Sequence, residues 1–220
     1  MASTIGGGIN EDGSLQNTLV IDEADLGKID IVQLTNAGVT EVAVNAPVKG
    51  LEIGLKGDVP VVIAGERIVD AVITNEAPKG KTAQFSLAVK KAKGLEFTTS
   101  GKGATDLTVA EGKFMKGSIT TAKSKAQDSI DFASASIVKS VDINTGAGSD
   151  SITFSGRMKG KSTIASGKGK DVIEVTQRTG KGKLILSDFN KKDTLIVGDD
   201  SFRLKDLENG DAPKWIKFDA

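Results

Sequence analysis

The chain repeats a short phrase, an aspartate followed by alternating apolar residues, between residues 128 and 197. Asp128-Ser-Ile-Asp-Phe132 returns as Asp150-Ser-Ile-Thr-Phe154, then as Asp171-Val-Ile-Glu-Val175 and as Asp193-Thr-Leu-Ile-Val197. The aspartates follow one another at a nearly constant interval of about 22 residues, and Asp106 lies one such interval before the first of them. A fixed period of roughly 20–50 residues is typical of repeat architectures. The pattern predicts an all-β fold: a single parallel β-solenoid (β-roll or β-helix) with coils of about 22 residues.

The same period continues into the first half of the chain. Lys49-Gly-Leu-Glu-Ile53 has a near-copy in Lys93-Gly-Leu-Glu-Phe97, two periods later. We expect each coil to contain two strands joined by Gly-rich turns such as Ser155–Gly160. Side chains alternate inward and outward along a strand, so Ile130, Ile152, Ile173 and Leu195 should form an aliphatic ladder. About eight coils stacked at ~4.8 Å would give a rod on the order of 40 Å long.

The pattern divides the chain into an N-terminal arm or cap at residues 1–18, the solenoid at residues 19–198 and a C-terminal cap at residues 199–220. Solenoids need capped ends, because an open terminal coil exposes unpaired backbone groups. In the C-terminal segment we expect a short helix at Phe202–Leu207 and a last strand at Trp215–Phe218.

Composition excludes several kinds of chemistry. The chain has 220 residues, with 29 basic and 29 acidic side chains, and it contains neither His nor Cys. The absence of both residue types removes the usual catalytic triads, thiol nucleophiles and zinc ligand sets. A net charge of zero and few aromatic residues make nucleic acid an unlikely partner. The sequence shows no Sec-type signal peptide and no apolar stretch long enough for membrane insertion.

Two turns share a pattern of alternating glycines followed by an aspartate. Thr145-Gly-Ala-Gly-Ser-Asp150 and Ser166-Gly-Lys-Gly-Lys-Asp171 resemble the nonapeptide of the RTX (haemolysin-type) calcium-binding β-roll over roughly residues 100–200. That resemblance implies calcium ions held between successive turns, because calcium accepts six to eight oxygen ligands. The residues it would assign to the metal are Asp150 and Asp171, the loop glycines Gly146, Gly148, Gly167 and Gly169, and then Asp128 and Asp193.

The pattern also departs from that family. Half a coil here is about 11 residues long, which is longer than the family's nonapeptide, and Thr145 and Ser166 replace the first Gly of the phrase. Lys168 and Lys170 lie inside the loop that would bind the cation. A second interpretation therefore stays open. The glycines permit positive φ in a tight turn, and the stacked aspartates accept backbone hydrogen bonds or pair with these lysines.

Lysines recur in the predicted turns and could stack into basic stripes along the rod. They are Lys79, Lys81, Lys102, Lys159, Lys161, Lys168, Lys170, Lys181 and Lys183. Such stripes could contact phosphates or anionic glycans. The favoured interpretation is that these lysines are solvated and discourage pairing of strand edges.

By exclusion, the sequence favours a non-catalytic structural or adhesive solenoid. We expect a component or decoration of an extracellular surface or a virus particle, with protein partners in that assembly and a homo-oligomer as an option. The first alternative is an RTX-like calcium-binding module of a protein secreted without a leader. The second is a polysaccharide-cleaving β-helix enzyme, which would act through paired carboxylates.

Overall fold

The computed structural model describes residues 18–21, 32–34, 41–56, 60–121, 125–176 and 181–219. The predicted N-terminal arm therefore lies outside the described residues, except for Thr18. Within the described ranges, no helix is long and apolar enough to cross a membrane.

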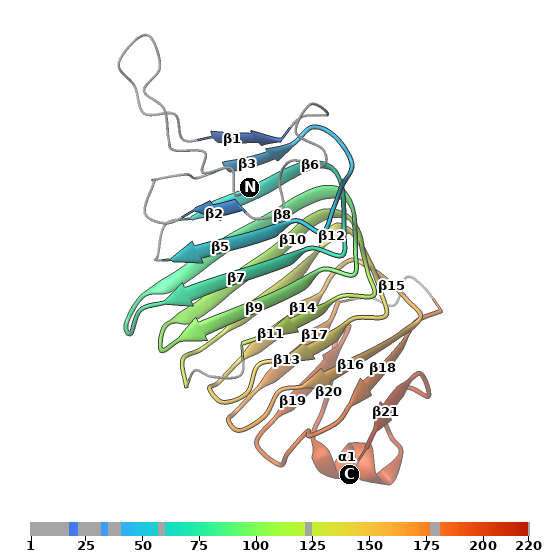
Figure 1. Cartoon of the computed structure of the whole chain (residues 1–220). Helices are drawn as coiled ribbons and strands as arrows, with labels where there is room; N and C mark the ends of the chain where they lie inside the picture. Colours follow the sequence, from blue (N-terminus) through green and yellow to red (C-terminus); the bar gives the residue numbers. More distant parts are fainter. Residues whose placement is uncertain are drawn as a thin grey trace.

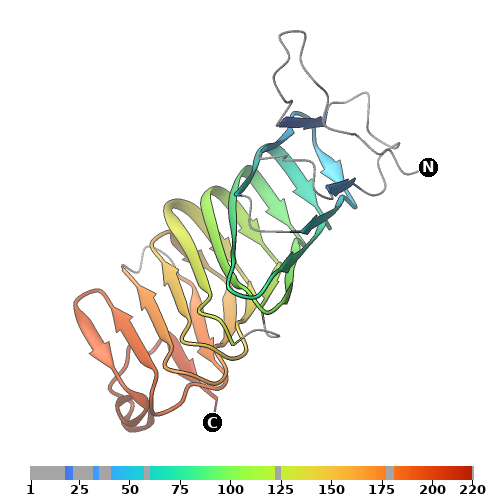
Figure 2. The same ribbon diagram turned by 90° about the vertical axis from the view of Figure 1, so that its left-hand side faces the viewer.

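The chain forms a parallel β-solenoid of about seven turns, with about 22 residues per turn, so the fold class predicted from the repeat is confirmed. The turn number is one lower than the sequence suggested. Strand makes up 62% of the described residues and helix 4%. Figures 1 and 2 show the coils stacked into a rod, with β1 near one end and the helix α1 at the other.

The strands fall into two sheets that run the length of the rod. The larger sheet has 12 strands: β1 (Thr18–Ile21), β3 (Glu41–Val44), β4 (Val48–Lys49), β6 (Val61–Val69), β8 (Thr82–Lys93), β10 (Ala104–Met115), β12 (Ser129–Lys139), β14 (Ser151–Phe154), β15 (Arg157–Lys159), β17 (Val172–Val175), β19 (Thr194–Val197) and β20 (Asp200–Phe202). The smaller sheet has nine: β2 (Val32–Leu34), β5 (Glu52–Lys56), β7 (Val72–Ala77), β9 (Glu96–Gly101), β11 (Ser118–Thr120), β13 (Asp142–Asn144), β16 (Lys161–Ala165), β18 (Lys183–Leu186) and β21 (Ile216–Phe218).

Each central coil has three straight segments, not the two predicted. The long strands β6, β8, β10 and β12 bend part-way, with Gly65 and Gly112 at positive φ in two of the bends. Their final residues pair with one another and with β4 and β15. The predicted turn Ser155–Gly160 thus contains a strand. We call this third surface the narrow face; it comprises residues 48–49, 67–69, 91–93, 113–115, 137–139 and 157–159.

The core is a set of stacked apolar ladders. Ile130 pairs with Ile152, Ile152 with Ile173 and Ile173 with Leu195, and all four side chains are buried. The predicted aliphatic ladder is therefore confirmed. Beside it, the rings of Phe132 and Phe154 stack in parallel with centroids 4.9 Å apart. Each fully buried side chain of this size contributes roughly 1.5–3 kcal/mol through removal from water.

The first aspartate of the predicted repeat, Asp106, is one residue out of register. It pairs with Ser129, and Thr105 instead occupies the position that Asp128 holds in the next coil. The reason is that the sequence separation from Thr105 to Asp128 is one residue longer than that from Asp128 to Asp150. A shift of one residue moves a side chain to the opposite face of a strand. Asp106 therefore points outward, and the prediction that it continues the aspartate repeat is wrong.

The C-terminal segment folds over the last coil. Strand β20 turns back to pair antiparallel with β19, and the six-residue helix α1 (Leu204–Asn209) follows. Gly210 ends the helix in the left-handed conformation. Strand β21 then pairs with β18, and Trp215, Leu204 and Leu207 pack against the end of the core. The last strand lies where the sequence predicts it, whereas the helix begins two residues later than predicted because Phe202 ends β20.

Candidate functional site

The four aspartates of the repeat form a buried ladder at one corner of the solenoid. Asp128, Asp150, Asp171 and Asp193 are each at most 2% exposed. In every case Oδ1 accepts a backbone N–H from the preceding coil. Thr105 N donates to Asp128 at 2.7 Å, Asp128 N to Asp150 at 2.9 Å, Asp150 N to Asp171 at 2.9 Å and Asp171 N to Asp193 at 3.0 Å. The structure thus brings the four predicted aspartates together as links between coils.

A second ladder, made of hydroxyl side chains, runs beside the aspartates. Thr121 Oγ1 donates to the carbonyl oxygen of Thr145 at 3.4 Å, and Thr145 Oγ1 donates to that of Ser166 at 3.2 Å. Thr145 and Ser166 are the residues that replace the first Gly of the RTX phrase. The departure from the family therefore has a structural role, because it supplies a buried polar group next to each carboxylate.

The second carboxylate oxygen of three aspartates has no hydrogen-bond donor. Oδ2 of Asp128, Asp150 and Asp171 is buried and unpaired. Burial raises the pKa of all three carboxyls, and it raises the pKa of Asp150 to about 6. The Asp128 N–H and the Thr145 hydroxyl lower the pKa of Asp150, while the charges on Asp128 and Asp171 raise it. A buried, unpaired anionic oxygen is costly, so burial shifts these carboxyls toward the neutral acid.

The Thr145 hydroxyl lies beside this carboxyl. It donates to the carbonyl oxygen of Ser166 at 3.2 Å, and its hydrogen bond to Asp150 favours the charged form. Burial is the larger effect, so the pKa of Asp150 is raised overall. Protonation removes the buried charge while Oδ1 keeps the N–H of Asp128. We infer that Asp150 stabilises the coil stack best in its protonated form.

Calcium would be the other way to satisfy these oxygens, and the turn geometry does not fit it. The carbonyl oxygen of Gly146 accepts the N–H of Lys168 at 2.7 Å, and Gly148 N donates to the carbonyl oxygen of Lys168 at 3.0 Å. A Cβ added at Gly167 would lie 1.6 Å from the Gly146 oxygen, and one at Gly169 would lie 1.6 Å from the Gly148 oxygen. Gly148, Gly167 and Gly169 therefore allow neighbouring turns to stack in direct contact. Nor does any part of the chain that the structure describes gather three acidic side chains around a metal position.

Asp188 is a site residue that the repeat did not reveal. Its Oδ1 accepts the N–H of Ser166 and its Oδ2 accepts the N–H of Gly167, both at 2.8 Å. Asp193 has a second contact as well, because its Oδ2 accepts the N–H of Asn190 at 2.7 Å. These two carboxylates close the C-terminal end of the ladders. The phrase Ser187-Asp-Phe-Asn190 just before Asp193 was the available signal for this function.

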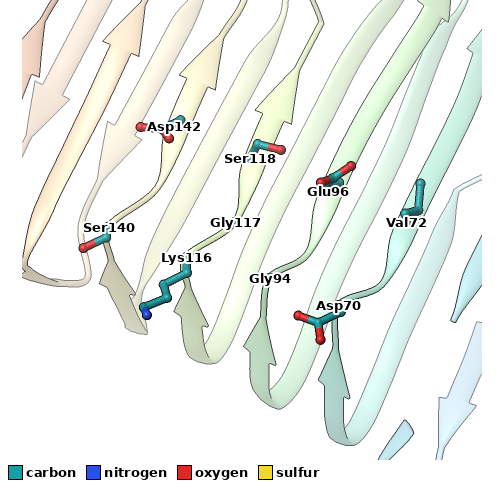
Figure 3. Close-up of a pocket in the computed structure, with 9 residues that line it drawn as sticks. All are labelled: Asp70, Val72, Gly94, Glu96, Lys116, Gly117, Ser118, Ser140 and Asp142. Atoms are coloured by element: carbon teal, nitrogen blue, oxygen red, sulfur yellow. The ribbon is translucent and has the colours of Figure 1, made fainter. Parts of the chain in front are cut away.

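An open groove of about 490 Å³ lies where the narrow face meets the smaller sheet (Figure 3). Asp70, Lys116 and Ser140 stand at this turn with positive φ in successive coils, as does Gly94. The groove also contains exposed carboxylates, and the strand register places Glu96 two coils from Asp142. Two coils correspond to roughly 10 Å. The full lining is Asp70, Val72, Gly94, Glu96, Lys116, Gly117, Ser118, Ser140 and Asp142.

The narrow face itself carries an array of cations. The first and third residues of each three-residue segment point outward, and together with Lys49 they form two columns along the rod. In the first column, Arg67 pairs with Lys91 and Lys91 pairs with Lys113. Of its eleven outward positions, eight hold Lys or Arg and none holds Asp or Glu. The cations are Lys49, Arg67, Lys91, Lys93, Lys113, Lys139, Arg157 and Lys159, and the other three positions hold Val69, Met115 and Ile137. Only Lys159 belongs to the turn lysines singled out from the sequence.

Comparison with known proteins gives no match to a family model, to a curated sequence or to a solved structure. The likeness to the RTX phrase therefore stays a resemblance of two turns. Function has to be inferred from the ladders, the groove and the narrow face of this chain.

Proposed function

We propose that this chain is a non-catalytic structural or adhesive rod, a component or decoration of an extracellular surface or a virus particle. The observation that carries the proposal is the regularity of the solenoid. Its coils advance by about 22 residues each, and from β6 to β19 no more than eight residues separate one strand from the next along the chain. Enzymes usually carry their binding and catalytic residues on loops held by a rigid scaffold.

The side-chain inventory supports the same function. With no His and no Cys in the sequence, proton transfer would fall to carboxylates, Lys or Arg. Four of the five described carboxyls with a raised pKa, Asp128, Asp150, Asp171 and Asp193, are buried inside the coil stack, where they bond to backbone groups. The fifth, Asp131, is half-buried on the outer side of β12. What the described coils present to their surroundings is a set of faces and the groove beside the narrow face. Contacts through these faces would hold protein partners of the assembly or further copies of this chain.

Surface labelling tests the proposal. Antibodies raised against the folded rod should label intact, unpermeabilised cells or purified particles of the source organism, as seen by immunogold electron microscopy. Pre-incubation with the purified rod should abolish the label. Labelling that appears only after the envelope or particle is opened would contradict an exposed structural function.

Calcium binding is the second candidate function, as an RTX-like module of a protein secreted without a leader. The observation in its favour is the set of unpaired buried Oδ2 atoms on Asp128, Asp150 and Asp171. A cation near them would remove the cost that burial imposes on their charge. Thermal melts in EDTA and in calcium separate a proton-linked ladder from a calcium-linked one.

A further inference from the structure

We propose that the narrow face binds a linear acidic polysaccharide laid along the rod axis. The inference rests on the proposed adhesive function and names the chemistry of the surface that the rod would contact. It assigns binding to the cations Lys49, Arg67, Lys91, Lys93, Lys113, Lys139, Arg157 and Lys159.

The array is regular along one direction only. Adjacent parallel strands lie ~4.8 Å apart, so each column offers a side chain at that interval over five successive coils, from Arg67 to Arg157. The face is three residues wide, and the middle residue of each segment, such as Ile68 or Val138, points into the core. A ligand that matches this surface is long, narrow and charged at repeated intervals. A linear polymer with acidic groups along its length has this form.

Ion pairs do not neutralise the cations of this face within the described ranges. The ion pair next to the face joins Lys90 to Glu66, which leaves the eight cations of the columns outside it. Like charges directly opposite each other on neighbouring strands destabilise a sheet, as Lys91 and Lys113 illustrate. An array of this kind costs stability, and an anionic ligand would remove the repulsion. Although the whole chain has no net charge, its charge is segregated, so a polyanion meets a strongly positive strip.

The surroundings favour a polysaccharide over a nucleic acid. The three uncharged positions on the face are Val69, Met115 and Ile137, which offer aliphatic contact to a sugar ring but no aromatic platform for a base. The adjoining groove presents Ser118 and Ser140 together with exposed carboxylates. Those carboxylates can accept hydrogen bonds from free sugar hydroxyls, which the deoxyribose units within a DNA strand lack. An acidic sugar has both the anion for the face and the hydroxyls for the groove.

The test measures binding of fluorescently labelled polygalacturonate to the full chain by anisotropy, with dextran and a single-stranded DNA oligonucleotide as comparison polymers. We expect polygalacturonate to bind, dextran not to bind and DNA to bind more weakly. Raising salt from 50 to 200 mM should weaken binding, because charge neutralisation releases counterions. The triple variant Lys93→Gln, Lys113→Gln, Lys139→Gln should bind at least roughly tenfold more weakly. A matched variant of equal net charge, Lys79→Gln, Lys102→Gln, Lys168→Gln, should bind within about twofold of the wild type, because surface cations off the face contribute little.

The outcomes are separable. The proposal is overturned if both triple variants bind equally weakly or if the wild type does not bind polygalacturonate. It is also overturned if the oligonucleotide binds more tightly than polygalacturonate, because the face would then be a nucleic-acid site. Coincident circular dichroism melts of all three proteins show that lost binding is not lost folding. The bound polygalacturonate is also recovered and its reducing ends are counted. An increase over time would contradict the non-catalytic function while leaving the binding face in place.

Discussion

Replacing Gly167 by Ala should destabilise the solenoid by more than about 3 kcal/mol. Gly167 has φ +80°, and a Cβ built on it would lie 1.6 Å from the carbonyl oxygen of Gly146 in the preceding coil. The left-handed conformation alone costs an alanine roughly 1–2 kcal/mol. The remainder arises because the two turns must move apart, which disturbs the hydrogen bond from Lys168 to Gly146. Urea unfolding followed by circular dichroism measures the loss.

Gly80→Ala is the matched control. Gly80 has φ +76°, almost the same backbone conformation, but no atom lies within 4 Å of the added Cβ. Gly80→Ala should therefore lower the free energy of unfolding by only about 1–2 kcal/mol, which is the cost of the left-handed conformation. The difference between the variants reports how closely the turns stack. Equal losses for both would show that the stacking of Gly167 on Gly146 contributes nothing.

The buried aspartates should make the protein more stable in mild acid than at neutral pH. Burial raises the pKa of Asp150 from its ordinary 3.8 to about 6, and it raises the pKa of Asp128, Asp171 and Asp193 as well. Between these values the folded state binds more protons than the unfolded state, so the free energy of unfolding falls as pH rises. We expect it to fall by roughly 1–2 kcal/mol from pH 4 to pH 7 for Asp150 alone, after allowance for screening by solvent.

Two substitutions at Asp150 should have opposite effects at pH 7.5. Asn has nearly the shape of the protonated acid, and its Oδ1 can accept the N–H of Asp128 without placing a charge in the buried site. Asp150→Asn should therefore be as stable as the wild type or up to about 2 kcal/mol more stable, with a flatter pH profile. Asp150→Ala leaves the Asp128 N–H unpaired and creates a cavity, for a loss of roughly 2–4 kcal/mol. A destabilised Asn variant would contradict the protonated ladder.

The repeat period and the alternation of apolar residues predicted most of the fold. The inward ladder from Ile130 to Leu195 follows directly from them, because a strand has a period of two and a coil has a near-constant length. The wrong prediction for Asp106 shows that the period alone does not fix which face of a strand a residue occupies. One extra residue between two coils moves an inward side chain to the outer face of its strand. Nothing in the local sequence Asp106-Leu-Thr-Val109 shows that such a residue is present. The third segment was missed because three residues between turn-forming residues, as in Gly156–Gly160, look like a turn.

Some residues of the candidate sites could be predicted from the repeat and others could not. The aspartates were visible because each opens its strand, whereas Asp188 lies outside the repeated phrase and contacts Ser166 only through the coil stacking. The narrow face was hidden because neighbouring cations of a column are a whole coil apart in sequence and each coil contributes only one or two. The available signal was a recurring triplet with an apolar centre, such as Lys91-Ala-Lys93 and Arg157-Met-Lys159. A net charge of zero concealed it further.

The most direct test of a rod held together by its own ladders is a pair of thermal melts at pH 7.5, in excess EDTA and in millimolar calcium, followed by circular dichroism. We expect both melts to be β-rich and to agree within about 1 °C, since packing and the hydrogen bonds of Asp128, Asp150, Asp171 and Asp193 supply the stability. A calcium site would add about 2.7 kcal/mol at a hundredfold excess of calcium over its Kd. A rise of several degrees in calcium, or a fold present only with calcium, would contradict this account and identify the aspartates as metal ligands.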